Sequence, residues 1–274
     1  MRERKGEKAK KRKEENMRWS THRRIAAALC RRYDIPDMLA DAAVAPDREP
    51  ELRLVYRRGK VRVVRVPHHA ANPKHIFAHL KRSRRDFLRG RLSYVEHLGK
   101  ALHYLQDSLV STHAKLWIFR FRSRAKHENL EQEIAQLRIP QAKIKEGEEL
   151  FQEALKSELT VAALKKVLSE ELRAENNAER ALARAVLLSS LLARAVTFPP
   201  ERMSSQKRRE IERRFAERKK GHLLAIATLA LTALALYITG SAFGSLLALA
   251  TAYLVHRFDF IYHRLKEEKE WWIS

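Results

Sequence analysis

A long segment near the C-terminus without any charged side chain restricts the fold of this chain more than any other feature. Leu223 to Val255 is a stretch of 33 residues that contains no Asp, Glu, Lys or Arg. Turn-forming residues from Gly240 to Ser245 divide it into two apolar runs, Leu223 to Thr239 and Leu246 to Val255. A helix that crosses a bilayer needs about 20 apolar residues, with a lower limit of roughly 17. The pattern therefore predicts a two-helix transmembrane hairpin.

Basic residues flank this hairpin on both sides and are missing from its turn. Lys219 and Lys220 precede it, and Arg257, Arg264 and Lys266 follow it. Because positive charge is enriched on the cytoplasmic side, both ends of the hairpin are predicted to face the cytoplasm from a cell membrane that the chain crosses twice. The alternative is a buried helical hairpin in a soluble bundle, but such helices usually keep a polar face. The terminal tryptophans, Trp271 and Trp272, are interpreted as interfacial aromatics.

The charge of the chain favours polyanionic partners. The formal net charge is +23, with 56 Lys and Arg against 33 Asp and Glu. An anionic phospholipid surface or a nucleic acid would be attracted to such a chain. The single cysteine, Cys30, excludes an intrachain disulfide and is typical of a reducing compartment. Residues 1–18 are strongly basic and lack the apolar region of a signal peptide, which predicts a disordered arm.

Between the arm and the hairpin, the pattern is mainly helical. Residues 51–56 and 61–66 are the exception, because β-branched and basic residues alternate there around a turn that contains Gly59, which predicts a β-hairpin with a solvated basic face. Pro199 and Pro200 break the helical pattern of residues 141–197. We therefore expect five parts: a disordered arm (1–18), a helical domain (19–198), a basic amphipathic linker helix (199–221), the transmembrane hairpin (222–257) and a cytoplasmic tail (258–274).

Metal-binding residue types recur at helical spacing within "HLGKALHYLQDSLVSTH", residues 97–113. His103 and Asp107 are four residues apart, His113 follows, and His127 and Glu131 repeat the four-residue spacing, giving H-x3-D-x5-H-x13-H-x3-E. Residues four apart lie on one helix face, so each pair can offer two ligands to one metal ion. For one such pair alone, a hydrogen bond on the surface of a helix is the better explanation. Two pairs joined by a further histidine predict a metal site, and imidazole with carboxylate suits zinc.

The pattern "HLGKALHYLQDSLVSTH…HENLE" resembles the core motif of the zinc-dependent phospholipase C family, which is related in fold to S1/P1 nucleases. The resemblance covers Trp19 to Glu131 and implies an all-helical bundle with a zinc cluster in a cleft. It implies hydrolysis of phosphoric esters, in phospholipids or, in the nuclease branch, in nucleic acids. The fold expected for the whole chain is therefore an all-α bundle of this type with a small β-hairpin insertion, followed by the C-terminal transmembrane hairpin.

Three upstream segments resemble further family motifs. "MRWSTHRRIA" implies Trp19 and His22 as ligands, and "APDREP" implies a metal-binding or general-base aspartate, Asp47. Asp41 is the alternative to Asp47. "PHHAANP" resembles the segment of the next metal-binding histidine, and the Asn-Pro pair that follows favours His69 over His68.

Carried over residue by residue, the resemblance implies two or three zinc ions. His69, His103 and Asp107, with Asp47, would hold the first, and His113, His127 and Glu131 the second. His22 would hold the third and share Asp107 as a bridging carboxylate. In secreted members the mature chain begins at the tryptophan that binds this third zinc, whereas here eighteen residues precede Trp19, which would then offer only its carbonyl.

These observations predict a membrane-anchored, zinc-dependent hydrolase of the phospholipase C type that acts on phospholipid headgroups. The alternatives are a tethered nuclease or nucleotide phosphatase, and a non-catalytic membrane protein that keeps the fold. The remaining histidines are given structural roles. His75, His79 and His97 are expected to pack or to face solvent, and His222, His256 and His263 to anchor the apolar hairpin at the interface.

Overall fold

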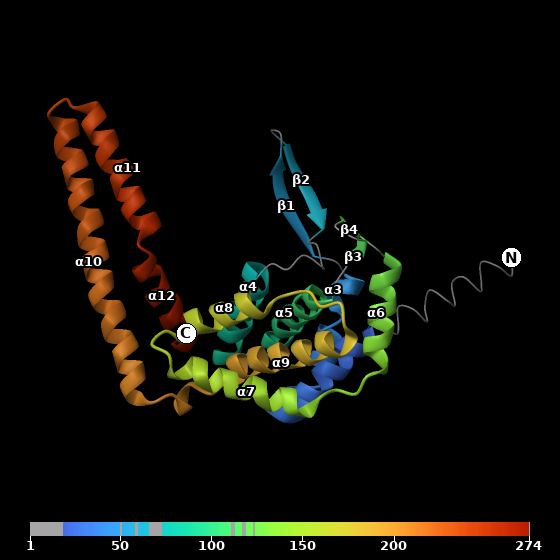
Figure 1. Cartoon of the computed structure of the whole chain (residues 1–274). Helices are drawn as coiled ribbons and strands as arrows, with labels where there is room; N and C mark the ends of the chain where they lie inside the picture. Colours follow the sequence, from blue (N-terminus) through green and yellow to red (C-terminus); the bar gives the residue numbers. More distant parts are fainter. Residues whose placement is uncertain are drawn as a thin grey trace. The chain divides into compact units, whose positions relative to one another are not determined.

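The chain is mainly helical in the computed structural model, which describes residues 19–49, 51–57, 60–65, 73–110, 113–116, 119–122 and 124–273. The predicted all-α class is confirmed (Figure 1). A first helix covers residues 19–33. The later elements are α2 (Leu39–Ala42), α3 (Ala45–Arg48), β1 (Leu52–Arg57), β2 (Lys60–Arg65), α4 (Pro73–Leu88), α5 (Ser93–Leu109), β3 (His113–Leu116), β4 (Phe119–Arg122), α6 (Arg124–Gln136), α7 (Gln141–Lys156), α8 (Thr160–Glu171), α9 (Ala178–Thr197), the 3₁₀ turn Pro200–Arg202, α10 (Ser205–Ile238), α11 (Ala242–Phe258) and α12 (Phe260–Trp272).

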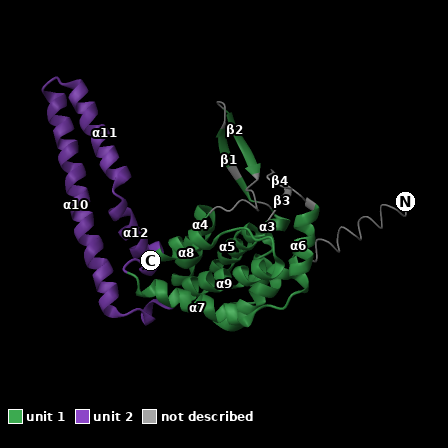
Figure 2. Ribbon diagram, in the orientation of Figure 1, with its two compact units in different colours: residues 1–157, 163–198 green, residues 158–162, 199–274 purple. Residues whose placement is uncertain are grey.

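Two compact units make up the chain (Figure 2). The first unit comprises residues 1–157 and 163–198, and the second comprises residues 158–162 and 199–274. The main boundary follows Phe198, where Pro199 and Pro200 were predicted to interrupt the helix. All of the predicted metal ligands fall within the first unit.

Helix α5 is the central helix of the first unit and packs against α2, α4 and α9. Leu98, Leu102, Leu105 and Leu109 form its apolar stripe and are fully buried. The polar residues Gln106, Asp107 and Ser108 are buried as well, so α5 is enclosed on nearly every side. The histidine- and aspartate-containing motif therefore lies on a core helix.

A glycine on α5 allows α2 to approach closely. A Cβ atom added to Gly99 would lie 2.5 Å from the backbone carbon of Ala42, closer than real Cβ contacts allow. The two helices can therefore pack at this distance only without a side chain at residue 99. This contact brings the backbone carbonyl of Ala43 next to His103, one turn farther along α5.

Helix α9 is fixed at both ends. The side chain of Asn177 accepts a hydrogen bond from the amide of Arg180 (2.9 Å), which caps the first turn. At the other end, the buried guanidinium of Arg84 donates to the carbonyls of Val196 (2.8 Å) and Phe198 (2.7 Å). These bonds satisfy carbonyl groups that the helix itself leaves without partners.

The predicted β-hairpin is present as β1 and β2, which pair antiparallel with Leu54 opposite Val63 and Tyr56 opposite Val61. This register places Leu52, Leu54, Tyr56, Val61 and Val63 on one face, and all five are strongly exposed. The other face carries Val55, Arg62 and Val64. The hairpin therefore presents an exposed apolar face in addition to the basic one that was predicted.

A second hairpin, β3 with β4, was not predicted. His113 begins β3 and pairs with Arg122 of β4. The sequence pattern predicted a mainly helical region here, with residues 51–56 and 61–66 as its one exception. Four-residue strands are too short for a clear alternating pattern, so the sequence alone did not reveal them.

The apolar segment of the second unit forms two helices, α10 and α11, that pack against each other. Helix α10 is long and apolar enough to cross a membrane, whereas α11 is a shorter apolar helix of 17 residues. Leu224, Ile238 and Phe243 are 70%, 75% and 81% exposed, so the structure does not bury this segment as a soluble core would. The predicted linker helix is not separate, because α10 runs without a break from Ser205 through Gly221 into the apolar region.

The prediction for the two tryptophans near the end of the chain is wrong. Trp271 and Trp272 are buried and do not form an exposed interfacial pair. The Trp272 indole donates to the buried carboxylate of Glu268 (2.9 Å), which also accepts bonds from the amides of Thr160 (2.9 Å) and Val161 (2.8 Å). The carboxylate thus caps the first turn of α8 and ties α12 to it.

His222 is also buried, so it is not an exposed anchor. Its Nδ1 atom lies 2.9 Å from Asp259, and its Nε2 atom lies 3.1 Å from Nδ1 of His256. Asp259 also pairs with Arg218 (2.7 Å) and accepts a hydrogen bond from the amide of Tyr262 at the start of α12. These contacts join α10, α11 and α12 at the end of the apolar helices opposite their turn.

Candidate metal centre

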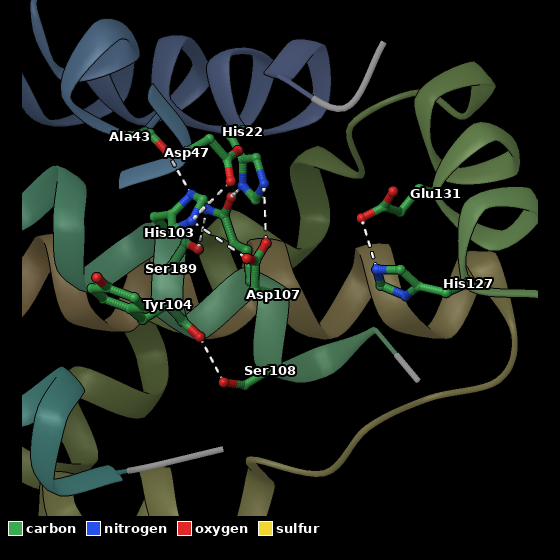
Figure 3. A network of polar contacts seen from close by, with 11 residues as sticks. His22, Ala43, Asp47, His103, Tyr104, Asp107, Ser108, His127, Glu131 and Ser189 are labelled. Atoms are coloured by element: carbon green, nitrogen blue, oxygen red, sulfur yellow. Dashed lines mark hydrogen bonds and ion pairs between the residues drawn. The ribbon is translucent and has the colours of Figure 1, made fainter. Parts of the chain in front are cut away.

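His103 and Asp107 face each other from successive turns of α5, as their spacing predicts. Nε2 of His103 lies 3.3 Å from Oδ2 of Asp107 (Figure 3). Both side chains are buried. Placing an imidazole and a carboxylate in the core is costly unless they are paired or bind a metal. The pair is therefore a buried contact and not the surface hydrogen bond that the four-residue spacing alone would suggest.

The first helix adds a second histidine to the same carboxylate. Nε2 of His22 lies 3.2 Å from Oδ1 of Asp107, and the His22 and His103 rings are 4.9 Å apart. The two oxygens of Asp107 thus face two histidines on two different helices (Figure 3). The Asp107 carboxylate is therefore shared by the two imidazoles. The potential ligand atoms of these three residues all lie within 4.8 Å of one another.

Outer hydrogen bonds fix which nitrogen of each histidine faces Asp107. Nδ1 of His103 lies 3.1 Å from the carbonyl oxygen of Ala43, which can only accept a hydrogen bond. Nδ1 of His22 lies 2.6 Å from Oε1 of Gln106, whose amide nitrogen donates to Ser189 (2.9 Å). Both Nδ1 atoms therefore carry hydrogen, which leaves both Nε2 atoms available to a metal. Protein metal sites commonly orient histidine ligands by such outer bonds.

The carboxylates around His22 favour a positive charge at this position. Burial alone would lower the pKa of His22, but hydrogen bonding to Asp107, the negative charge of Asp107, the bond to Gln106 and the charge of Asp47 outweigh it and raise the pKa to about 9. Without a metal, the Nε2 proton of His22 lies between the imidazole and Asp107. A bound cation would take the place of that proton, since metal ions displace protons from their ligands.

Asp47 belongs to this group of residues, whereas Asp41, the alternative aspartate, does not. Oδ1 of Asp47, on α3, lies 3.7 Å from Nε2 of His103 (Figure 3). Asp41 is exposed and pairs with Arg23 at 2.7 Å. The geometry therefore favours Asp47 over Asp41 as the aspartate of this centre. Trp19 begins the first helix, and its ring contacts the guanidinium of Arg48, 5.0 Å from the ring centroid.

The second predicted pair lies on α6, apart from the first group in Figure 3. Nε2 of His127 is 3.1 Å from Oε1 of Glu131, and both side chains are largely buried. His113 lies in β3, which contacts α6, but its side chain is outside the described part of the structure. His68 and His69 also lie outside the described residues.

A pocket connects the two groups. It is lined by the polar residues His22, Gln106, Asp107 and Glu131, and its empty volume, open mouth included, is about 420 Å³. The remaining lining is Thr21, Ile25, Val110, Ile134, Ala181, Leu182 and Ala185. The candidate ligands thus open onto a space with polar and apolar walls.

A second potential metal group, which the sequence reading did not predict, comprises Glu51, His75 and His79. His75 and His79 were expected only to pack or to face solvent. Their four-residue spacing on α4 is the signal that could have revealed them, because it equals that of His103 and Asp107. The role of Gln106 in orienting His22 was also missed.

Comparison of this chain with protein families, characterised proteins and solved structures returns no match. Buried imidazole and carboxylate groups with outer hydrogen bonds fit a metal ion.

Proposed function

We propose that this chain is a membrane-attached, zinc-dependent phosphoric ester hydrolase similar to phospholipases C. The observation that carries the proposal is the position of the Asp107 carboxylate between Nε2 of His22 and Nε2 of His103, 3.2 and 3.3 Å away. A carboxylate placed to bridge two imidazoles from different helices suits a cluster of metal ions better than a single structural ion.

In this proposal, His103, Asp107 and Asp47 contribute to one zinc site together with His69. His22 shares Asp107 at a neighbouring site, and Glu131 with His127 and His113 forms another. Zinc lowers the pKa of a coordinated water toward about 7 and so supplies the attacking group for a phosphoric ester. Asp47 is positioned at the edge of the group to accept a proton. The Ala43 carbonyl and Gln106 hold the two imidazoles in the required tautomers.

The lining of the pocket supports a lipid substrate over a nucleotide. Ile25, Ile134 and Leu182 contribute apolar surface beside the charged group. Base stacking on aromatic rings is typical of sites for single-stranded nucleic acids. Among the described residues that line the pocket, none is Phe, Tyr or Trp. The exposed apolar face of β1 and β2, which begins five residues after Asp47, also favours contact with a lipid surface.

We further propose that α10 and α11 attach the protein to a cell membrane. Large apolar side chains are exposed along both helices. Extended exposed apolar surface is unusual on a soluble monomer, so these side chains need a non-aqueous environment. Lys219 and Lys220 on one side, and Arg257 and Arg264 on the other, favour the cytoplasm for both ends of the helical pair. The basic part of α10 would add attraction to anionic lipid.

A substrate panel tests the proposal. The full chain, purified in detergent and loaded with zinc, is incubated separately with phospholipid vesicles, single-stranded DNA, RNA and nucleoside monophosphates. We expect release of a phosphorylated headgroup from phospholipid. Release of nucleotides or of inorganic phosphate from the other substrates would instead support the nuclease or phosphatase alternative. A zinc-loaded protein that hydrolyses none of them would support the non-catalytic alternative.

A further inference from the structure

We propose that Glu51, His75 and His79 form a separate zinc site that holds the start of the β1–β2 hairpin against α4. This inference does not depend on the proposed hydrolase function. It concerns a different set of ligands, and it would stand if the chain had no enzymatic activity.

The three ligand groups converge on one point. Nε2 of His79 lies 3.1 Å from Oε2 of Glu51, and Nε2 of His75 lies 3.5 Å from the same oxygen. The potential ligand atoms all lie within 4.8 Å of one another. Two histidines four residues apart on one helix, joined by a carboxylate from elsewhere in the chain, are a common zinc ligand set.

Three polar groups of the chain face Oε2 of Glu51. The hydroxyl of Tyr104 donates to this oxygen at 3.3 Å, in addition to the contacts from the two imidazoles. A cation among the two Nε2 atoms and Oε2 would be bound by the imidazole lone pairs and the carboxylate together.

His79 has a further unsatisfied atom. The side chain is almost completely buried, at 3% exposed, and its Nδ1 atom has no hydrogen-bond partner among the described residues. A buried polar atom without a hydrogen-bond partner destabilises the folded state. Burial of the His79 ring is therefore unfavourable in itself, and metal binding at the other nitrogen, Nε2, would compensate for it.

The surrounding charges are compatible with a divalent cation. Lys100 approaches the other carboxylate oxygen, Oε1 of Glu51, at 3.3 Å, and so leaves Oε2 to the histidines. Lys100 also forms an ion pair with Glu96, 3.1 Å between Nζ and Oε1. Outer hydrogen bonds of this kind commonly orient a ligating carboxylate. His97 is the next imidazole, 6.2 Å from His79 between ring centroids, but it faces Asp86 at 3.7 Å.

Two neighbouring residues of α5 contact the two candidate centres. His103 belongs to the first centre, and the following residue, Tyr104, reaches Glu51. Consecutive helix residues point about 100° apart, so the two sets lie on different sides of α5. A three-ligand site would keep one position for water, but the proposal requires only that the ion links Glu51 to α4.

Zinc stoichiometry tests the site directly. The double variant Glu51→Gln/His75→Ala removes two ligands that are partly exposed, so the core is little affected. We expect it to bind about one zinc fewer per chain than the parent, as a three-ligand site predicts. The control His97→Ala alters a nearby imidazole that is not in the group and should leave zinc content unchanged. A folded double variant with the parent's zinc content would overturn the proposal.

A second measurement does not require the double variant to fold. In the Asp107→Asn variant, where the first centre is impaired, zinc should slow tryptic cleavage at Arg53 and Arg62 of the hairpin. Equal cleavage rates with and without zinc would contradict the proposed link. Because this experiment does not measure hydrolysis, failure of the hydrolase proposal and failure of this site are distinguishable.

Discussion

Gly99 and Ala42 set the distance between α5 and α2, because a Cβ atom on residue 99 would lie 2.5 Å from the Cβ of Ala42. The close approach brings the Ala43 carbonyl to Nδ1 of His103 and so orients the imidazole. The close packing of α5 against α2 therefore also determines the orientation of a candidate metal ligand.

The Gly99→Ala substitution is therefore expected to destabilise the protein by about 1–3 kcal/mol, the usual cost of overpacking. This is opposite to the effect of the same change in an open helix, where alanine is favoured by roughly 1 kcal/mol. Gly221→Ala on α10, where no atom lies within 4 Å, is the matched control and should not lower stability. Chemical denaturation followed by circular dichroism measures both. A Gly99→Ala variant as stable as the parent would show that the two helices can separate without cost.

The Asp107→Asn substitution should reduce hydrolysis more than about 100-fold, since even loss of an outer-shell partner costs 10–100-fold in metal sites. The change removes the negative charge that faces both histidines but keeps the volume of the side chain, so helical content should remain near the parent's. Asp41→Asn, an exposed aspartate paired with Arg23, is the control. Activity close to the parent's in the Asp107 variant is incompatible with a bridging role.

Gln106→Leu tests the orientation of His22. The amide oxygen of Gln106 accepts the Nδ1 hydrogen of His22 at 2.6 Å, and leucine cannot replace that acceptor. We expect zinc affinity to fall by about 10–100-fold, as for other outer-shell substitutions. Isothermal titration with zinc provides the measurement. Ser189→Ala, which removes only the hydroxyl behind Gln106, should have a smaller effect.

The sequence allowed several of these features to be predicted because they depend on local spacing. Four-residue spacing places His103 beside Asp107 and His127 beside Glu131, and alternation predicts β1 and β2. The four-residue spacing of His75 and His79 is also local, but their partner Glu51 lies 28 positions before His79, across the hairpin, so the spacing does not reveal the complete cluster. Similarly, the burial of Trp272 depends on Glu268 and the first turn of α8, which the apolar composition of the C-terminal region does not reveal.

Cys30 provides a pH-dependent test of the core of the first unit. Burial, followed by the charge of Asp37, raises the pKa of the thiol to about 11. In the unfolded chain the thiol ionises near ~8.5. Because the folded state retains its proton to higher pH, the contribution of Cys30 to stability should fall as pH rises from about 8.5 to about 11. Thiol reagents at pH 8 should react with Cys30 only after denaturation, and rapid reaction of the native chain would contradict its burial.

Membrane attachment is tested by a chain that ends at Lys220. Without the apolar parts of α10 and α11, this chain should no longer require detergent, yet it should still bind anionic vesicles at low salt. That binding should weaken as salt rises, because exposed charges are screened over about 8 Å at physiological ionic strength. Protease added outside sealed cells should reach at most the turn between α10 and α11. Cleavage of the histidine-containing unit from outside would reverse the proposed orientation.

The most direct test of the central claim is the position of zinc in crystals of the zinc-loaded protein, measured by anomalous scattering at the zinc absorption edge. The account predicts a peak within about 2.0–2.2 Å of an Asp107 oxygen and of Nε2 of His22 or His103. A structure in which zinc is absent from this position, and in which His22 and His103 still contact Asp107 directly, would contradict the claim, even if zinc were found beside Glu51.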